Sequence, residues 1–194
     1  MRSWAALSIF GDSEAGRVRA AQRGDRRAFD ALVRAYEGPL RGFLVRRAGP
    51  GAADDVLQET LLAAWTAIPR FDGRSRFKAW LYGIALHKVT DSRRAQGRAP
   101  VDAWSDVAED QASDEPDPFA ASDLRHSVRA VLAELPPVQR EVLELYYYAE
   151  LTLPEVAETL GRNLNTVKYQ FYRAHTQAAD CLREHDSARP GERS

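Results

Sequence analysis

The chain has almost no cysteine, few histidines and no hydrophobic run long enough to span a bilayer. Its 194 residues include one cysteine, Cys181, and four histidines. A single cysteine excludes a disulfide framework within the chain, and no cluster of Cys and His residues has the spacing of metal ligands. We therefore expect a cytoplasmic protein without a bound metal and without membrane insertion.

Catalytic motifs are also missing. The four histidines are scattered along the chain, and there is neither a glycine-rich phosphate loop nor a nucleophile motif. Most carboxylates outside one acidic segment fall on the surfaces of predicted helices. Because no catalytic constellation is present, we expect no catalytic residue, no cofactor and no enzymatic activity.

Charge is distributed unevenly, although the net charge is only −1. Residues 1–98 carry a net charge of +8, residues 99–121 carry −7, and residues 122–194 carry −2. The middle segment has three prolines, seven acidic residues and no basic residue, which is typical of a linker. The sequence therefore predicts two domains, 1–98 and 122–194, joined by an acidic flexible linker at 99–121. A disordered C-terminal tail is expected, and the linker acids can serve simply to keep the tether soluble and extended.

The segments before the linker have helical patterns and no strand alternation. Residues 14–34 and 39–48 carry apolar residues at helical spacing, with a possible break at Gly24-Asp25. In the next segment Leu57, Leu61, Ala64 and Ile68 form an inward stripe. The outward side then carries Asp54, Asp55, Gln58, Glu59 and Leu62. Acids in a first helical turn also stabilise the helix through its dipole, so helix stabilisation alone accounts equally well for the first two acids.

Residues 71–98 begin with a glycine-containing loop and continue as a helix rich in aromatic and basic residues. We expect Phe77, Leu81 and Ile84 in the core, with Trp80 or Val89 beside them. The remaining side chains form a basic surface with interleaved aromatics, which suits phosphates and unstacked bases. They are Arg74, Arg76, Lys78, Tyr82, His87, Lys88, Arg93 and Arg94. A solvated basic helix face is the alternative interpretation.

After the linker, three helices are predicted. Pro136-Pro137 opens the first, with Val138, Val142 and Leu145 facing inward. A capping box formed by Thr152 and Glu155 starts the second, and Gly161 ends it. A short capped helix, a turn and a further amphipathic helix form the helix-turn-helix pattern, whose second helix enters the major groove of DNA.

The last of these helices has a polar side. Its core positions are Val167, Phe171, Ala174 and Ala178, and an exposed stripe consists of Thr166, Tyr169, Gln170 and Arg173, with Lys168, Tyr172 and His175 beside it. Gln and Arg can read base edges, and Lys or Arg can hold phosphates, so this side is predicted to bind DNA. An ordinary helical bundle would give the same pattern in this segment alone.

The motifs taken in order resemble a known family. "DDVLQETLLAAW", "FDGRSRFKAWLYGIALHKVTDSRR", the acidic linker and "LPPVQREVLELYYYAELTLPEVAETLGRNLNTVK" are similar to the extracytoplasmic-function (ECF) sigma factors of bacterial RNA polymerase, over roughly residues 14–183. The resemblance implies an all-α, two-domain factor that directs transcription initiation and is a monomer when free. Its implied partners are the β′ clamp and β flap of core polymerase, promoter DNA and an anti-sigma factor, and the linker would thread the RNA exit path.

The resemblance also implies three sets of site residues. The polymerase-binding set is Asp54, Asp55, Gln58, Glu59 and Leu62. The set that captures the melted minus-ten element is Phe71, Arg74, Arg76, Lys78, Trp80, Tyr82, His87, Lys88, Asp91 and Arg94. The set that reads the minus-thirty-five element is Arg162, Asn165, Thr166, Lys168, Tyr169, Gln170 and Arg173.

Two segments depart from the family pattern at positions expected to face DNA. Where relatives commonly have "TVKSRL", this chain has "TVKYQF" at residues 166–171, and His87 stands where an Asn is usual. Promoter sequences of relatives therefore do not transfer to this chain. A conventional regulator that binds a two-fold operator as a dimer is the alternative function, although no heptad seam or dimer face accompanies the helix-turn-helix.

Overall fold

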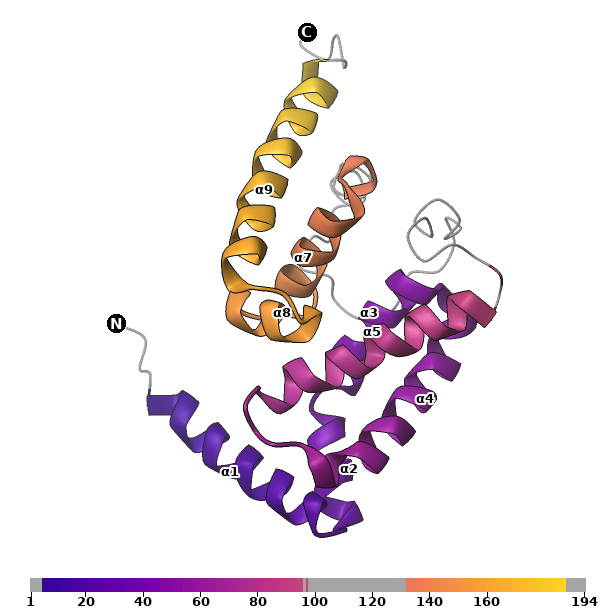
Figure 1. The fold of residues 1–194 in the computed structure, drawn as a ribbon, viewed down its shortest axis with the longest axis vertical. Helices are drawn as coiled ribbons and strands as arrows, with labels where there is room; N and C mark the ends of the chain where they lie inside the picture. The colour runs from indigo at the N-terminus through magenta and orange to yellow at the C-terminus, as the bar shows by residue number, and fades with distance from the viewer. Residues whose placement is uncertain (1–4, 96, 98–131, 188–194) are drawn as a thin grey trace, which may run out of the picture. The chain divides into compact units, whose positions relative to one another are not determined.

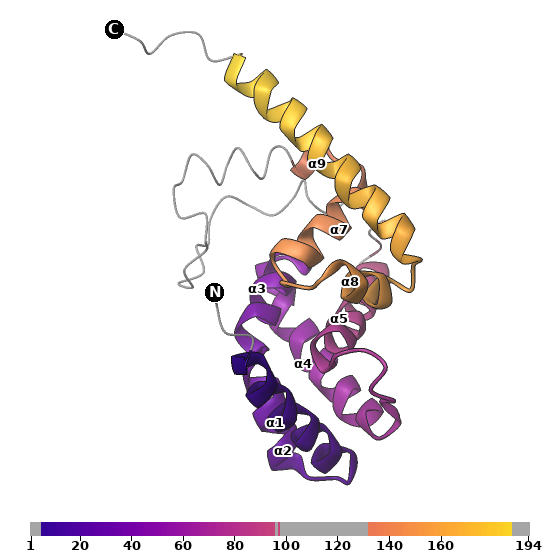
Figure 2. The ribbon, with the colours of Figure 1, turned by 90° about the vertical axis from the view of Figure 1, so that its left-hand side faces the viewer.

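The computed structural model describes residues 5–95, 97 and 132–187, and it divides into two compact units, Met1–Arg98 and Ala99–Ser194 (Figures 1 and 2). Within the described residues every regular element is a helix, so the predicted all-α class is confirmed. The segment predicted as an acidic linker and residues 188–194 of the predicted tail lie outside the described residues. Both stay predictions, whereas residues 184–187, the start of the tail predicted to be disordered, belong to a helix that ends at Ser187, so the prediction is wrong there.

Unit 1 contains the elements α1 (Ala5–Gln22), α2 (Arg26–Arg34), α3 (Glu37–Ala48), α4 (Pro50–Ala67), the short 3-10 helix η1 (Ile68–Arg70) and α5 (Phe77–Ala95). Helix α1 packs along α2, and α3, α4 and α5 pack on one another (Figure 1). The break predicted near Gly24 is confirmed, because the Asp25 carboxylate caps α2 by accepting from the Ala28 N–H at 3.1 Å.

The core of unit 1 is made of apolar side chains from α2 to α5. Its buried members include Phe29, Leu32, Leu40, Phe43, Leu44, Val56, Leu57, Ala64, Ile68, Phe77, Leu81 and Val89. The predicted inward stripe of α4 is therefore confirmed at three positions, while Leu61 is only half-buried. Each large apolar side chain buried in this way contributes about 1.5–3 kcal/mol, so these contacts fix which side of α4 and α5 faces outward.

Unit 2 contains α7 (Pro137–Tyr147), α8 (Leu153–Leu160) and α9 (Leu164–Ser187), and α9 packs on both other helices (Figure 2). The predicted capping box is present. A carboxylate oxygen of Glu155 accepts from the Thr152 N–H at 2.8 Å, and the Thr152 hydroxyl accepts from the Glu155 N–H at 3.5 Å. Gly161 ends α8 with φ of 59°, a left-handed conformation that favours glycine.

The core of unit 2 confirms the inward positions of Val142 and Leu145, which are wholly buried. The prediction for Val138 is wrong, since this side chain is 41% exposed. The first turn of α7 instead turns Arg140 inward. Its guanidinium donates to the carbonyls of Leu132, Ala133 and Leu135 at 2.7–3.0 Å, so the buried side of this first turn is anchored by a polar side chain.

Candidate protein and nucleic-acid interfaces

The outer side of α4 carries the five residues predicted to bind polymerase. All five are exposed, because the opposite side of the helix is buried in unit 1. Leu62 is the most apolar of them and is 68% exposed. The structure therefore brings these residues to one accessible side of one helix.

Two of the acids on this side form ion pairs within unit 1. The Arg41 guanidinium binds the Asp54 carboxylate at 2.7 Å, and this hydrogen bond lowers the pKa of Asp54 below its ordinary value. Lys88 lies 3.6 Å from Glu59. Since Lys88 belongs to the predicted DNA-binding set, the predicted polymerase and DNA surfaces adjoin at this pair.

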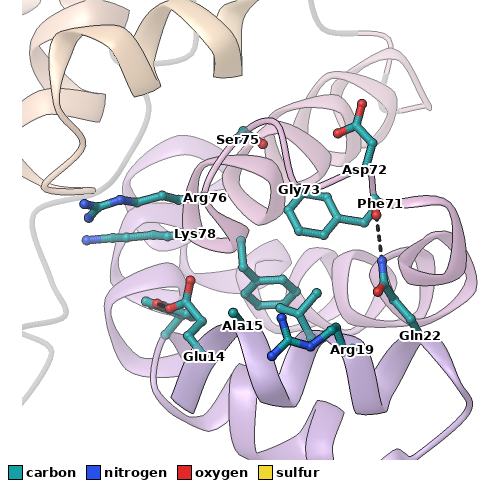
Figure 3. Close-up of a pocket in the computed structure, with 13 residues that line it drawn as sticks. Glu14, Ala15, Arg19, Gln22, Phe71, Asp72, Gly73, Ser75, Arg76 and Lys78 are labelled. Atoms are coloured by element: carbon teal, nitrogen blue, oxygen red, sulfur yellow. Dashed lines mark hydrogen bonds between the residues drawn. The ribbon is translucent and has the colours of Figure 1, made fainter. Parts of the chain in front are cut away.

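The loop that precedes α5 is held in a defined conformation by its own residues. An oxygen of Asp72 accepts from the Arg74 N–H at 3.0 Å, and Gly73 has φ of 70°. The carbonyl of Phe71 accepts from the side-chain amide of Gln22 at 2.6 Å, across 49 residues of sequence (Figure 3). Gln22 was not predicted as a functional residue, and no spacing or motif in the sequence signals this contact.

Two aromatic residues predicted to touch DNA are buried, so the expectation that they lie on the surface is wrong. Phe71 is 8% exposed, and its ring lies 4.9 Å from that of Trp80. Tyr82 is fully buried, and its ring meets that of Phe43 edge-on at 5.2 Å. Arg93 is also buried and donates to the carbonyl of Arg47. Tyr82 and Arg93 are buried because α5 packs against both α3 and α4, which buries a wider sector of this helix than one neighbour would. Phe71, in the loop before α5, is buried because its ring packs against those of Phe77 and Trp80.

The other residues of the predicted minus-ten set remain accessible. Arg74, Arg76, His87, Asp91 and Arg94 are exposed, and Lys78, Trp80 and Lys88 are half-buried. Some of the charge is balanced locally, since Arg74 lies 3.2 Å from Asp72 and Arg94 lies 3.8 Å from Asp91. The surface is basic, as predicted, and within this set Trp80 is the one aromatic side chain that reaches it.

The first turns of α9 present the polar stripe predicted to read duplex DNA. Asn165, Thr166, Lys168, Tyr169 and Arg173 are exposed, and Arg162 and Gln170 are half-buried. Val167 and Ala174 are wholly buried on the other side. Within the stripe the Arg173 guanidinium donates to the Tyr169 hydroxyl at 2.6 Å, and Arg162 lies 3.0 Å from Glu141.

An aromatic cluster that sequence reasoning missed joins α7 to α9. The Tyr147 hydroxyl and the imidazole of His175 are 3.1 Å apart, and the rings of Tyr146 and Phe171 are 4.7 Å apart. Burial raises the pKa of the Tyr147 phenol, and the neighbouring Tyr146 adds to this effect. His175 therefore packs against α7. The run of three tyrosines at 146–148 is the feature of the sequence from which this cluster could have been predicted.

No group of His, Cys, Asp or Glu side chains suited to a metal ion occurs in the part of the chain that the structure describes. In the same part, no helix combines the length and apolar character needed to cross a membrane.

Two family models match the chain. Sigma-70 region 2 matches residues 32–99, which include α3, α4, α5 and the loop before α5. Sigma-70, region 4 matches residues 125–176, which include α7, α8 and the first half of α9. Helix α1 precedes both matched segments.

Relatives and solved structures agree with these matches. The chain is 33% identical over 170 residues to the RNA polymerase sigma-H factor of Pseudomonas aeruginosa, covering 81% of this chain and 87% of that one. It is 30% identical over 167 residues to the ECF RNA polymerase sigma-E factor of Haemophilus influenzae, covering 81% and 88%. The structure of CnrH in complex with the cytosolic domain of CnrY matches with a TM-score of 0.67 and 27% identity, covering 89% of this chain and 98% of that one.

Proposed function

Because this chain belongs to the ECF sigma factors of bacterial RNA polymerase and is a factor for transcription initiation, we propose that its two units divide promoter recognition between them. Unit 1 binds core polymerase and captures the melted minus-ten element, and unit 2 reads the minus-thirty-five element. The observation that carries the proposal is that each unit exposes its own polar surface, one on α5 with its preceding loop and one on α9.

The minus-ten surface fits a single strand. Arg74, Arg76 and Lys78 stand at the loop and the start of α5, where they can hold phosphates, and the half-exposed Trp80 offers a ring for stacking. His87, Lys88, Asp91 and Arg94 follow along the same helix. The buried Phe71 and Tyr82 act by supporting this surface and not by touching DNA.

The surface of α9 fits duplex DNA. Gln170 and Arg173 can make bidentate contacts to base edges, and Lys168 can hold a phosphate. Asn165, Thr166 and Tyr169 at the start of the helix complete the set, with Arg162 in the turn before it. Since Tyr169, Gln170 and His87 depart from the common family residues, the preferred promoter differs from those of relatives.

The outer side of α4 fits a protein partner, and the proposed one is the β′ clamp of core polymerase, with the β flap bound by unit 2. Exposed acids beside the exposed Leu62 offer charged groups for ion pairs with a basic partner and apolar area for burial. CnrH, which shares the fold, is bound by the cytosolic domain of CnrY in its solved structure. We propose that an anti-sigma factor likewise covers part of this chain and controls its activity.

Core binding tests the α4 assignment. Asp55→Lys combined with Leu62→Ala should weaken binding to core polymerase about tenfold or more, because each removes a contact residue from the same side of the helix. The matched control is Asp30→Lys, an equal charge change at an exposed position of α2. Titration of labelled protein with core polymerase measures the affinity. If the double variant bound as tightly as the control, the assignment of α4 would be wrong.

A further inference from the structure

A pocket of about 630 Å³ lies between α1 and the segment 71–78 (Figure 3). Its volume falls within the usual range for small-molecule and cofactor sites. Glu14, Arg19 and Gln22 line it from α1, and Gly73, Arg76 and Lys78 line it from the loop and the start of α5. The loop proposed to capture the melted strand is therefore one wall of the pocket, and α1 is the other.

Nothing assigns α1 a part in DNA binding. The match to Sigma-70 region 2 begins at residue 32, after α1 has ended at Gln22. The three predicted sets of site residues also begin later in the chain.

The first contact fixes the start of the loop. The Gln22 side-chain amide donates to the Phe71 carbonyl at 2.6 Å, as the dashed line in Figure 3 shows. The Phe71 N–H donates to the carbonyl of Ile68 at 3.0 Å, and the Phe71 ring packs against those of Trp80 and Phe77. Both backbone polar groups and the side chain of Phe71 are thus held, and one of these attachments comes from α1.

The pocket lining combines cationic and apolar side chains. Arg19 on one wall and Arg76 and Lys78 on the other supply cationic groups, while the accessible Ala15, Val18 and Tyr36 supply apolar surface. The carboxylate of Glu14 accepts a hydrogen bond from the Tyr36 hydroxyl, so that acid has a partner in the protein. A nucleotide of an unpaired strand combines the two complementary features, an apolar base and an anionic phosphate.

We propose that α1 forms one wall of the minus-ten DNA site, in which Arg19 binds a phosphate of the captured strand and Gln22 is a positioning residue. Gln22 holds the loop from Phe71 to Arg76 in the conformation that accepts DNA. This inference rests on the proposed function of unit 1, and it adds to it a helix outside the segment that the family model matches.

Hydrogen–deuterium exchange of the full chain tests the positioning role without DNA. In Gln22→Ala and in Gln22→Glu, the amides of residues 72–76 should exchange about threefold to tenfold faster than in the wild type, because one hydrogen bond to the loop is lost. An ionised Glu has nearly the size of Gln but cannot donate, so the second variant separates hydrogen bonding from packing. Thermal unfolding followed by circular dichroism confirms that both variants are folded. Unchanged exchange in these folded variants would overturn the positioning role.

The salt dependence of DNA binding tests Arg19. Holoenzyme made with Arg19→Ala should bind a forked promoter fragment, with its minus-ten strand unpaired, with a salt slope about 0.7 smaller than that of the wild type. Arg17→Ala is the matched control, since Arg17 is exposed on the same helix but does not line the pocket. An equal slope for Arg19→Ala and the wild type would overturn the phosphate contact. If wild-type holoenzyme bound no forked fragment, the proposed function itself would fail and the Arg19 contact with it, whereas the exchange result would still decide the role of Gln22.

Discussion

Arg173 and Tyr169 show how the side chains of α9 are arranged before DNA binds. The guanidinium donates to the phenol oxygen one helical turn earlier and lies 5.9 Å from the centre of its ring. A long side chain held in this way loses less conformational freedom on binding than one that is free. Tyr169 therefore has two roles in the proposed site, as a contact residue and as a guide for Arg173.

Loss of Arg173 should be the more costly of the two changes. We expect Arg173→Ala to weaken binding of holoenzyme to a minus-thirty-five duplex by about 1–3 kcal/mol and to relax one base position. Tyr169→Phe should cost about 0.5–1.5 kcal/mol, because it removes only a hydrogen bond. Fluorescence anisotropy with single-base variants of the duplex measures both. Arg183→Ala, on the same helix but outside the stripe, is the control, and an unchanged base preference in Arg173→Ala would contradict the base-reading role.

The hydrogen bond from Arg41 to Asp54 has a consequence for the pH dependence of stability. The pKa of Asp54 in the folded chain lies below the ordinary value because Arg41 donates to this carboxyl. A carboxyl with a lowered folded pKa stabilises the fold above its unfolded pKa, and this contribution disappears as the pH falls through the folded pKa. We expect Arg41→Ala to raise the pKa of Asp54, as measured by carbon NMR of the side-chain carboxyl. The control Arg34→Ala, on α2, should leave the pKa of Asp54 unchanged. Identical titration of Asp54 in the two variants would refute the pairing with Arg41.

The ends of helices are the features that the local sequence predicts best. The break at Gly24-Asp25, the capping box of Thr152 and Glu155, and the end of α8 at Gly161 all appear where their motifs place them. These motifs work because the interacting groups are within a few residues of each other and need no tertiary contact. The helix-turn-helix geometry therefore follows from a short stretch of sequence.

Removal of the cap should loosen α8 selectively. Thr152→Ala deletes the hydroxyl that accepts from the Glu155 N–H, and such a loss costs about 1 kcal/mol. Because the chain has two units, exchange rates of α8 amides report this cost better than one unfolding midpoint. We expect faster exchange in α8 and no change in α4. Unchanged rates in α8 would show that the capping box does not stabilise this helix.

The turn between α7 and α8 offers a stabilising change. Glu150 has φ of 49°, and it is the non-glycine residue with positive φ among those that the structure describes. The left-handed conformation costs an ordinary residue about 1–2 kcal/mol, and glycine adopts it freely at some entropic cost in the unfolded chain. Glu150→Gly should therefore stabilise unit 2 by about 0.5–1 kcal/mol, seen as slower exchange of α7 and α8 amides. Faster exchange would mean that contacts of the Glu150 side chain outweigh the strain.

Packing between elements is where sequence reasoning was weaker. The exposed side of α4 was predicted from its apolar stripe, since periodicity identifies one buried face. Helix α5 has two neighbours, α3 and α4, so its buried sector is wider than the stripe and includes Tyr82. The contact between Gln22 and Phe71 joins residues far apart in the sequence through one polar side chain. No periodic pattern encodes such a contact, which explains why α1 received no functional prediction.

At the scale of the whole molecule, function depends on two units that carry separate surfaces. The sequence predicts this division because a basic first segment and a near-neutral last segment are separated by a segment with three prolines and a net charge of −7. Each unit has its own core, so a substitution on α9 should leave the surface of α4 intact. If the chain acts as a sigma factor, we expect a monomer in solution, whereas a conventional operator-binding regulator would be a dimer. Light scattering of the free chain separates these two outcomes.

The most direct test of the account is run-off transcription from fragmented genomic DNA of the source bacterium, with core polymerase alone and with this protein added. A sigma factor with two promoter-reading units should produce discrete new start sites that share two spaced upstream motifs. Arg173→Ala should alter use of the upstream motif, and Asp55→Lys with Leu62→Ala, which weakens binding to core polymerase, should reduce all new starts together. No new start sites with active core and folded wild-type protein would contradict the proposed role in promoter-specific initiation.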